Sequence, residues 1–164
     1  MASMNQEPTL RLHIDLVPES CWYSNLRHVL PDEAWDELRR KVYAACGYRC
    51  AICGARGQLH CHEVWSYDDA TRVQRLEGFQ ALCENCHHIK HLGYAGILAS
   101  QGKLDYDALV THFLRVNGCD RATFQRHRDE AFAQWEERSH HEWTTDFGLT
   151  LLFDGSAQSS LGVS

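Results

Sequence analysis

Apolar residues recur at helical spacing in the first third of the chain. Over residues 31–46, Trp35, Leu38 and Val42 fall about one turn apart, and acidic residues occupy the first turn. Gly47 follows directly and is a typical helix stop. The pattern predicts a helix over residues 31–46, with Trp35 and Val42 facing a core.

A second group of helical patterns lies in the C-terminal half. Residues 105–118 carry apolar side chains on one face and end with Gly118, a residue suited to a C-cap. Residues 120–141 continue with aromatic and apolar residues at the same spacing. We therefore expect a helical part over about residues 104–141.

Two stretches between these helices alternate apolar and polar residues. Residues 58–67 and 71–82 have strand-like patterns and are separated by the polar turn of residues 68–70. Together they predict a β-hairpin. A shorter alternation over residues 10–18 predicts another strand, stopped by Pro18.

The predicted hairpin runs directly into "CENCHHIKHLG", residues 83–93. This stretch reads as a short helix that ends at Gly93. The order of elements is thus a helix, a cysteine-containing turn, a hairpin, a short helix and a helical pair. It predicts an α+β fold with a small core over about residues 47–93 and flanking helices.

The composition is that of a globular protein. Of 164 residues, 44% are hydrophobic and 23% are charged. We expect one domain over residues 10–153, with disordered ends at residues 1–9 and 154–164. No apolar run is long enough to cross a bilayer, and residues 1–20 lack the basic start and apolar run of a targeting signal. A soluble, cytoplasmic protein without a membrane partner is expected.

The net charge of −6 argues against a protein that coats nucleic acid through bulk electrostatics. Lys and Arg supply most of such non-specific affinity, so a nucleic-acid role needs a local basic surface. Arg49, Arg56, Arg72 and Lys90 are candidates for phosphate contacts. Each of them fits a solvent-facing charge equally well.

Four of the eight cysteines have the spacing of a zinc site. Cys50 and Cys53 lie in "YRCAICG", and Cys83 and Cys86 lie in "ALCENCH", one pair on each side of the predicted hairpin. Four converging thiolates satisfy a tetrahedral zinc ion, and such a closed site is structural. The alternative is four cysteines without metal. The remaining four cysteines are expected to pack as small apolar side chains.

Histidines cluster around the same segments. His87 and His91 are four positions apart on the predicted helix, so they share a face and could chelate one ion. On the first strand, alternation puts His60 and His62 on one face and Glu63 on the other. If that face lies against the helix, His62 completes a site of three imidazoles with open positions, as in catalytic metal sites. A half-buried hairpin with solvated polar residues is the equally open alternative.

With these positions in view, "GYRCAICGARGQLHCHEVW" and "ALCENCHHIKHLG" resemble the HNH nuclease family, in the form that builds a ββα-metal motif on a treble-clef zinc site. The stretches "HIDLVPESCWYSNLRHVL" and "HHEW" extend the resemblance to a group of phage and bacterial HNH proteins. The resemblance implies a zinc-stabilised treble-clef core of hairpin and helix. It also implies His62, His87 and His91 as ligands of a catalytic ion and Glu63 as the general base.

Two positions depart from the family pattern. Glu63 stands where the family has a histidine, unless the register shifts by one residue, so that Cys61 is the ligand and His62 the base. Gly78 falls near the position of the family asparagine. A carboxylate is a chemically adequate substitute for the base, because a divalent ion already lowers the pKa of bound water.

The sequence therefore predicts a metal-dependent endonuclease that hydrolyses phosphodiester bonds of DNA or RNA. Its cofactors would be a structural zinc at the cysteines and one divalent cation, Mg, Mn, Ni or Zn, at the imidazoles. The rival prediction is a non-catalytic zinc module that binds a protein or a nucleic acid. The acidic net charge and the apolar residues of the C-terminal helices favour this rival.

Overall fold

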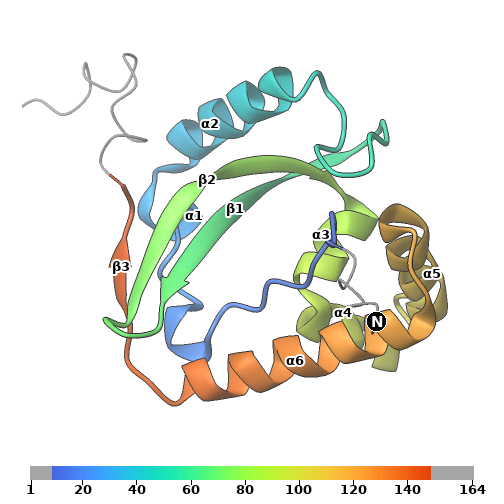
Figure 1. Ribbon diagram of the computed structural model, residues 1–164. Coiled ribbons are helices and arrows are strands. Elements are labelled where there is room, and N and C mark those ends of the chain that lie inside the picture. The colour runs from blue at the N-terminus through green and yellow to red at the C-terminus, as the bar shows by residue number, and fades with distance from the viewer. Residues whose placement is uncertain (1–8, 149–164) are drawn as a thin grey trace, which may run out of the picture.

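The computed structural model describes residues 9–148, and within them the fold is α+β, as the sequence predicts. Apart from residue 9, the ends expected to be disordered lie outside the described residues, as do residues 149–153. In chain order (Figure 1) the elements are the 3₁₀ turn η1 Glu19–Cys21, α1 Leu26–Val29, α2 Asp32–Ala45, β1 Leu59–Asp68, β2 Val73–Cys83, α3 Glu84–Lys90, α4 Leu92–Ser100, α5 Tyr106–Asn117, α6 Arg121–Ser139 and β3 Thr144–Asp146.

The predicted hairpin is confirmed as the antiparallel pair of β1 and β2. His62 pairs with Gln80, and the register shifts between Val64 and Trp65 because β2 carries an extra residue there. The short strand β3, which the sequence pattern did not predict, runs parallel to β2 and leaves β1 as an edge strand. Within residues 9–148, one edge of β1 therefore has no neighbouring strand, and the candidate ligand His62 lies on this strand.

The hairpin lies between α2 on one side and the helices α3 to α6 on the other (Figure 1). Trp35 of α2 is buried against the hairpin together with Leu26 and Leu76, whereas Val42 is only half-buried. A larger cluster, which includes Phe113 and Phe124, joins α3 to α6 and meets the hairpin at the end of β2, where Leu82 is buried. The two faces of β1 thus lie against different elements, so side chains that alternate along the strand contact different surroundings.

The sequence predicts that the helix after the hairpin ends at Gly93, and this prediction is wrong. It ends at Lys90, His91 adopts a non-helical backbone, and α4 begins at Leu92 with Gly93 inside its first turn. The segment "LGYAGILAS" is apolar on all sides, with Leu92 and Ala95 buried. A helix without a polar face has no amphipathic period, so the pattern gave no signal for α4.

The strand predicted over residues 10–18 is also absent: among the described residues this segment has no regular structure and joins no sheet. Leu12 and Ile14 are buried, which explains the alternation of apolar residues. The backbone groups instead bond to helices, since the Asn117 side chain binds the amide and carbonyl of Leu12. A strand pattern can therefore mark burial on one side without a neighbouring strand.

A buried lysine anchors this segment to α3. Lys90 is only 2% exposed, and its Nζ atom lies 2.9 Å from one carboxylate oxygen of Asp15. The Nε2 atom of His13 lies 3.0 Å from the other carboxylate oxygen. Burial raises the pKa of Asp15, but the hydrogen bond from His13 and the charge of Lys90 outweigh it and lower the pKa to about 2. The carboxylate is therefore ionised and paired in the folded protein.

We expect Asp15→Asn to lower the free energy of unfolding by about 1–3 kcal/mol, because it leaves a buried ammonium without its partner. The side chain of Asp15 is 38% exposed, so the loss stays below that of a fully buried pair. Urea denaturation at pH 7 measures it. Because the pKa is lower in the folded state, the ionised group stabilises above about pH 4, and the difference from Asp15→Asn should vanish as the pH falls toward 2.

The matched control is Asp36→Asn, which breaks an exposed ion pair with Arg39 on α2. Because this pair is exposed to solvent, its loss should lower the free energy of unfolding much less than Asp15→Asn does. Equal losses for the two variants would contradict the role given to the Asp15–Lys90 pair.

Candidate metal centres

The two cysteine pairs meet at one point beside the end of the hairpin. The four sulfurs lie within 4.8 Å of one another, and we call them the cysteine cluster: Cys50, Cys53, Cys83 and Cys86. The first pair sits in a tight turn after α2, and the second pair spans the end of β2 and the first turn of α3. The predicted convergence is confirmed, and the cluster is consistent with a zinc site.

Local hydrogen bonds shape the turn that carries the first pair. The backbone carbonyl of Cys50 accepts a hydrogen bond from the amide of Gly54. The φ of Gly54 is 75°, a backbone conformation that favours glycine. The amide of Ala51 donates to the carbonyl of Ala81, which ties the turn to β2. These backbone hydrogen bonds hold the first cysteine pair beside the second.

The protonation of the sulfurs is linked. Hydrogen bonds from the Cys83 and Cys86 thiols lower the pKa of Cys50, and the same interaction with Cys50 raises the pKa of Cys83 to about 11. Proton sharing among the sulfurs thus favours one thiolate over several. A divalent cation is the partner that allows all four to ionise together.

A histidine that the sequence analysis missed contacts this cluster. His112 of α5 is 6% exposed, and its Nε2 lies 3.2 Å from the sulfur of Cys86. Its Nδ1 lies 3.1 Å from the guanidinium of Arg115. A guanidinium can only donate, so Nδ1 accepts and Nε2 carries the hydrogen. Burial, with a smaller effect of Arg115, lowers the pKa of His112 and keeps the ring neutral.

It follows that His112 donates an N–H to the sulfur of Cys86, as outer-shell groups do for metal thiolates. We expect His112→Phe to weaken zinc retention about 10- to 100-fold, measured by competition with a chromophoric chelator. His112→Gln keeps an N–H donor and should retain most of the affinity. Thr111→Ala, on the exposed side of the same helix, is the control and should leave the affinity unchanged. Equal retention in all three variants would contradict the role of His112.

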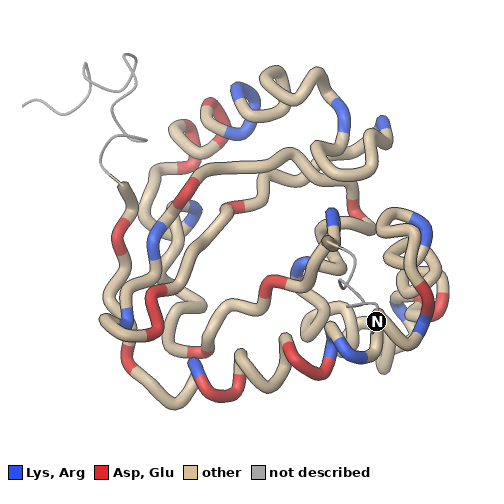
Figure 2. Tube along the Cα trace, in the orientation of Figure 1, with Lys and Arg blue, Asp and Glu red and all other residues tan. Residues whose placement is uncertain are grey.

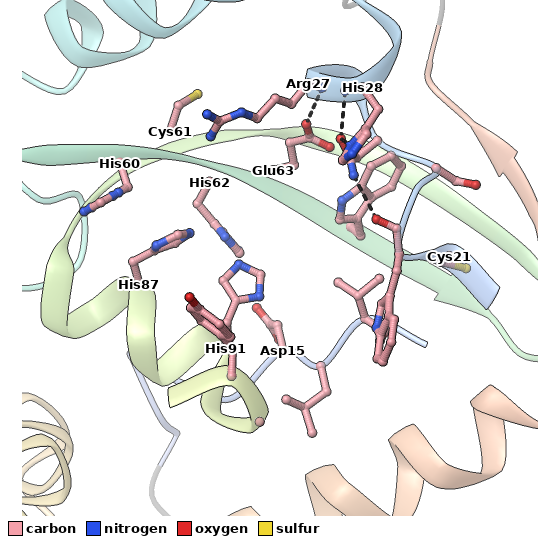
Figure 3. A pocket seen from close by; sticks show the side chains of 18 of the residues that line it. Asp15, Cys21, Arg27, His28, His60, Cys61, His62, Glu63, His87 and His91 are labelled. Atoms are coloured by element: carbon pink, nitrogen blue, oxygen red, sulfur yellow. Dashed lines mark hydrogen bonds between the residues drawn. The ribbon is translucent and has the colours of Figure 1, made fainter. Parts of the chain in front are cut away.

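The structure also brings together the three predicted imidazoles. Their ligand nitrogens lie within 4.8 Å of one another, and we call them the histidine cluster: His62, His87 and His91. His62 comes from β1, and the other two come from α3 and its C-cap (Figure 3). The ring centroids of His62 and His91 are 5.2 Å apart, and those of His87 and His91 are 4.8 Å apart. His60 stacks on His87 at 4.8 Å from outside the cluster.

Burial makes these imidazoles poor bases and good ligands. Desolvation, reinforced by the neighbouring imidazoles, lowers the pKa of His62 to about 2 and that of His87 to about 3. Desolvation also lowers the pKa of His91. Neutral rings offer lone pairs, and three of them from one side leave positions for water or substrate on an ion. The cluster fits one divalent cation with an open coordination sphere.

Glu63 is not brought to the histidine cluster. Its carboxylate lies on the other face of β1 and accepts from the amides of Leu26 and Arg27 at 3.4 and 3.3 Å (Figure 3). The bulge begins only after Val64, so it does not turn Glu63 inward. Burial raises the pKa of Glu63. Its side chain caps the first turn of α1, on the side away from the imidazoles.

The other two positions discussed from the sequence also lie outside the histidine cluster. Cys61 shares the face of Glu63, and burial raises its pKa to about 12. The shifted register, with Cys61 as the ligand, therefore does not match this geometry. Gly78 pairs with Val64 at the bulge, with φ of 158°.

The histidine cluster lines a cavity of about 1000 Å³, which we call the cleft. Residues 58–63 of the chain, most of them in β1, also line it. None of the four basic residues singled out in the sequence lines it. Lys90 is buried against Asp15, Arg72 lies 5.6 Å from the ring of Trp143, and Arg56 lines a separate cavity by the cysteine cluster. The basic residues of the cleft are Arg27 and Arg39, from α1 and α2. Only the folded chain brings these two to the same cleft as the histidines.

The fold and the two clusters define an α+β protein with two candidate metal centres, one closed by four cysteines and one open at three histidines. No protein-family model, curated protein or solved structure matches the chain. Among the described residues, no helix has both the length and the apolar composition needed to cross a membrane.

Proposed function

We propose that this protein is a metal-dependent endonuclease of the HNH type, which hydrolyses phosphodiester bonds in nucleic acid. The observation that carries the proposal is the histidine cluster: a β-hairpin and the helix that follows it present three neutral imidazoles to one point in a large cleft. The cysteine cluster at the end of the same hairpin supports it, because a closed zinc site would fix the angle between α3 and β1.

The residues of the chain have distinct roles in this proposal. The histidine cluster would hold one divalent ion, which when bound polarises a phosphate and lowers the pKa of nearby water. Arg27 and Arg39 line the cleft and would bind flanking phosphates. Glu63, which the family resemblance makes the general base, instead positions α1 and with it Arg27, whose backbone amide it binds.

The rival function is a non-catalytic zinc module that binds a protein or a nucleic acid. One observation favours it: no carboxylate of the described residues joins the histidine cluster, and Glu63 is occupied elsewhere. This rival predicts one tightly bound metal per chain and no turnover.

The deciding experiment measures bound metal per chain and then incubates the protein with single- and double-stranded DNA and RNA, with added Mg, Mn, Ni or Zn. The proposed function predicts one zinc retained at the cysteine cluster, a second divalent ion bound in its presence, and cleavage that requires this second ion. A single metal equivalent with no cleavage under any condition would establish the rival.

A further inference from the structure

Exposed aromatic rings flank the mouth of the cleft that holds the histidine cluster. Tyr94 is 60% exposed and Trp22 is 51% exposed, and both line the cleft. Tyr94 lies in the first turn of α4, three residues after His91. The indole of Trp22 is held by a hydrogen bond of 2.9 Å to the carbonyl of Val17. Both rings are thus exposed in the cleft, and Tyr94 lies close in the chain to the candidate ligand His91.

Aromatic and cationic groups also share the wall of the cleft on the side of α1 and α2. The guanidinium of Arg27 lies 6.0 Å from the centre of the Trp35 ring, a cation–π distance. Arg39 and Tyr43 line the same wall. Exposed rings and arginines in one groove are features that bind nucleic acid strands without reading their sequence; the exposed rings here are Tyr94 and Trp22.

These rings can stack only on bases that are not already stacked and paired in a duplex. Duplex binding depends instead on many phosphate contacts from a broad basic surface. This chain carries a net charge of −6, and Figure 2 shows Lys and Arg interspersed with Asp and Glu along α2, the hairpin and α6. His62, 4% exposed, is moreover recessed within the cleft. Each of these observations favours an unpaired strand over a duplex.

We propose that the cleft binds single-stranded nucleic acid, with one unpaired base stacked on Tyr94 while the adjoining phosphodiester faces the histidine cluster. Arg27 then contacts a neighbouring phosphate from the opposite wall. This inference rests on the proposed function and adds the class of substrate to it.

The test measures binding separately from cleavage. The zinc-loaded full-length protein is titrated against a fluorescein-labelled 12-nucleotide strand, as DNA and as RNA, and against the matching DNA duplex. Fluorescence anisotropy gives the dissociation constants, with no other divalent ion added and with the strands checked for integrity afterwards. We expect the single strand to bind more tightly than the duplex.

Tyr94→Ala should raise the dissociation constant for the single strand about 5- to 150-fold, the range for loss of one base-stacking ring. Tyr94→Phe keeps the ring and should bind like the unmodified protein. The matched control is Tyr48→Asn, which removes an equally exposed ring, 65% exposed, that does not line the cleft. Asparagine tolerates the positive φ of 55° at this position. This variant should bind normally.

Two results would overturn the inference: duplex binding as tight as or tighter than single-strand binding, or an unchanged dissociation constant for Tyr94→Ala. Either result leaves the proposed function standing if the protein cleaves duplex DNA with an added ion. Conversely, Tyr94-dependent binding of single strands without any turnover supports the inference about the cleft and refutes only the nuclease.

Discussion

Cys86→Ala is expected to leave the purified chain without zinc and without a cooperative thermal unfolding transition. The sulfur of Cys86 is fully buried within the main core and belongs to the cysteine cluster, so its loss removes a ligand and opens a cavity. A structural zinc site contributes free energy on the order of 10 kcal/mol, which is comparable to the whole stability of an ordinary domain. Loss of most of this free energy should therefore unfold the region around α3.

The measurement combines metal analysis by mass spectrometry with circular dichroism during heating. Cys46→Ala is the matched control, because Cys46 is half-buried at the end of α2 and lies outside the cysteine cluster. It should keep one zinc per chain and a midpoint within a few degrees of the unmodified protein. A folded, zinc-containing Cys86→Ala protein would show that the cluster is not a structural metal site.

The parts of the site that follow from local spacing could be predicted from the sequence. The four-residue spacing of His87 and His91 and the alternation along β1 could be used from the sequence alone, although His91 lies at the C-cap of α3 and not inside the helix. The clustering of His62 with them needed one further condition, that this face of β1 lies against α3. The structure satisfies it, because β2 continues without a loop into α3.

The parts that depend on distant segments could not be predicted. The carboxylate of Glu63 is bound by amides of α1, more than thirty residues earlier in the chain. His112 reaches Cys86 from α5, and its only signal in the sequence is a histidine on an otherwise apolar helix face. Arg27 and Trp22 enter the cleft from a stretch without regular periodicity. Periodic patterns report burial and element type, and they carry no information on which distant segment supplies a partner.

His62→Ala is expected to abolish binding of the second ion and to reduce cleavage more than about 100-fold, while the zinc at the cysteine cluster stays bound. Even an outer-shell partner is worth about 10- to 100-fold in metal affinity, and His62 would be a direct ligand. The readouts are metal content, single-turnover cleavage with added ion and the thermal midpoint. His88→Ala is the matched control, because His88 lies on α3 next to His87 but pairs with Glu84 at 3.7 Å, outside the histidine cluster.

Glu63→Gln tests whether Glu63 only positions α1, as its hydrogen bonds indicate, or acts as the general base that the family resemblance implies. With the carboxylate directed at α1, this variant should bind the second ion normally and lose less than about 10-fold in rate, since positioning alone is affected. A loss as large as that of His62→Ala, with fold and metal content intact, would show that Glu63 turns inward when substrate binds and acts as the base. Full activity of His62→Ala would instead remove the histidine cluster from the reaction and refute the active site proposed here.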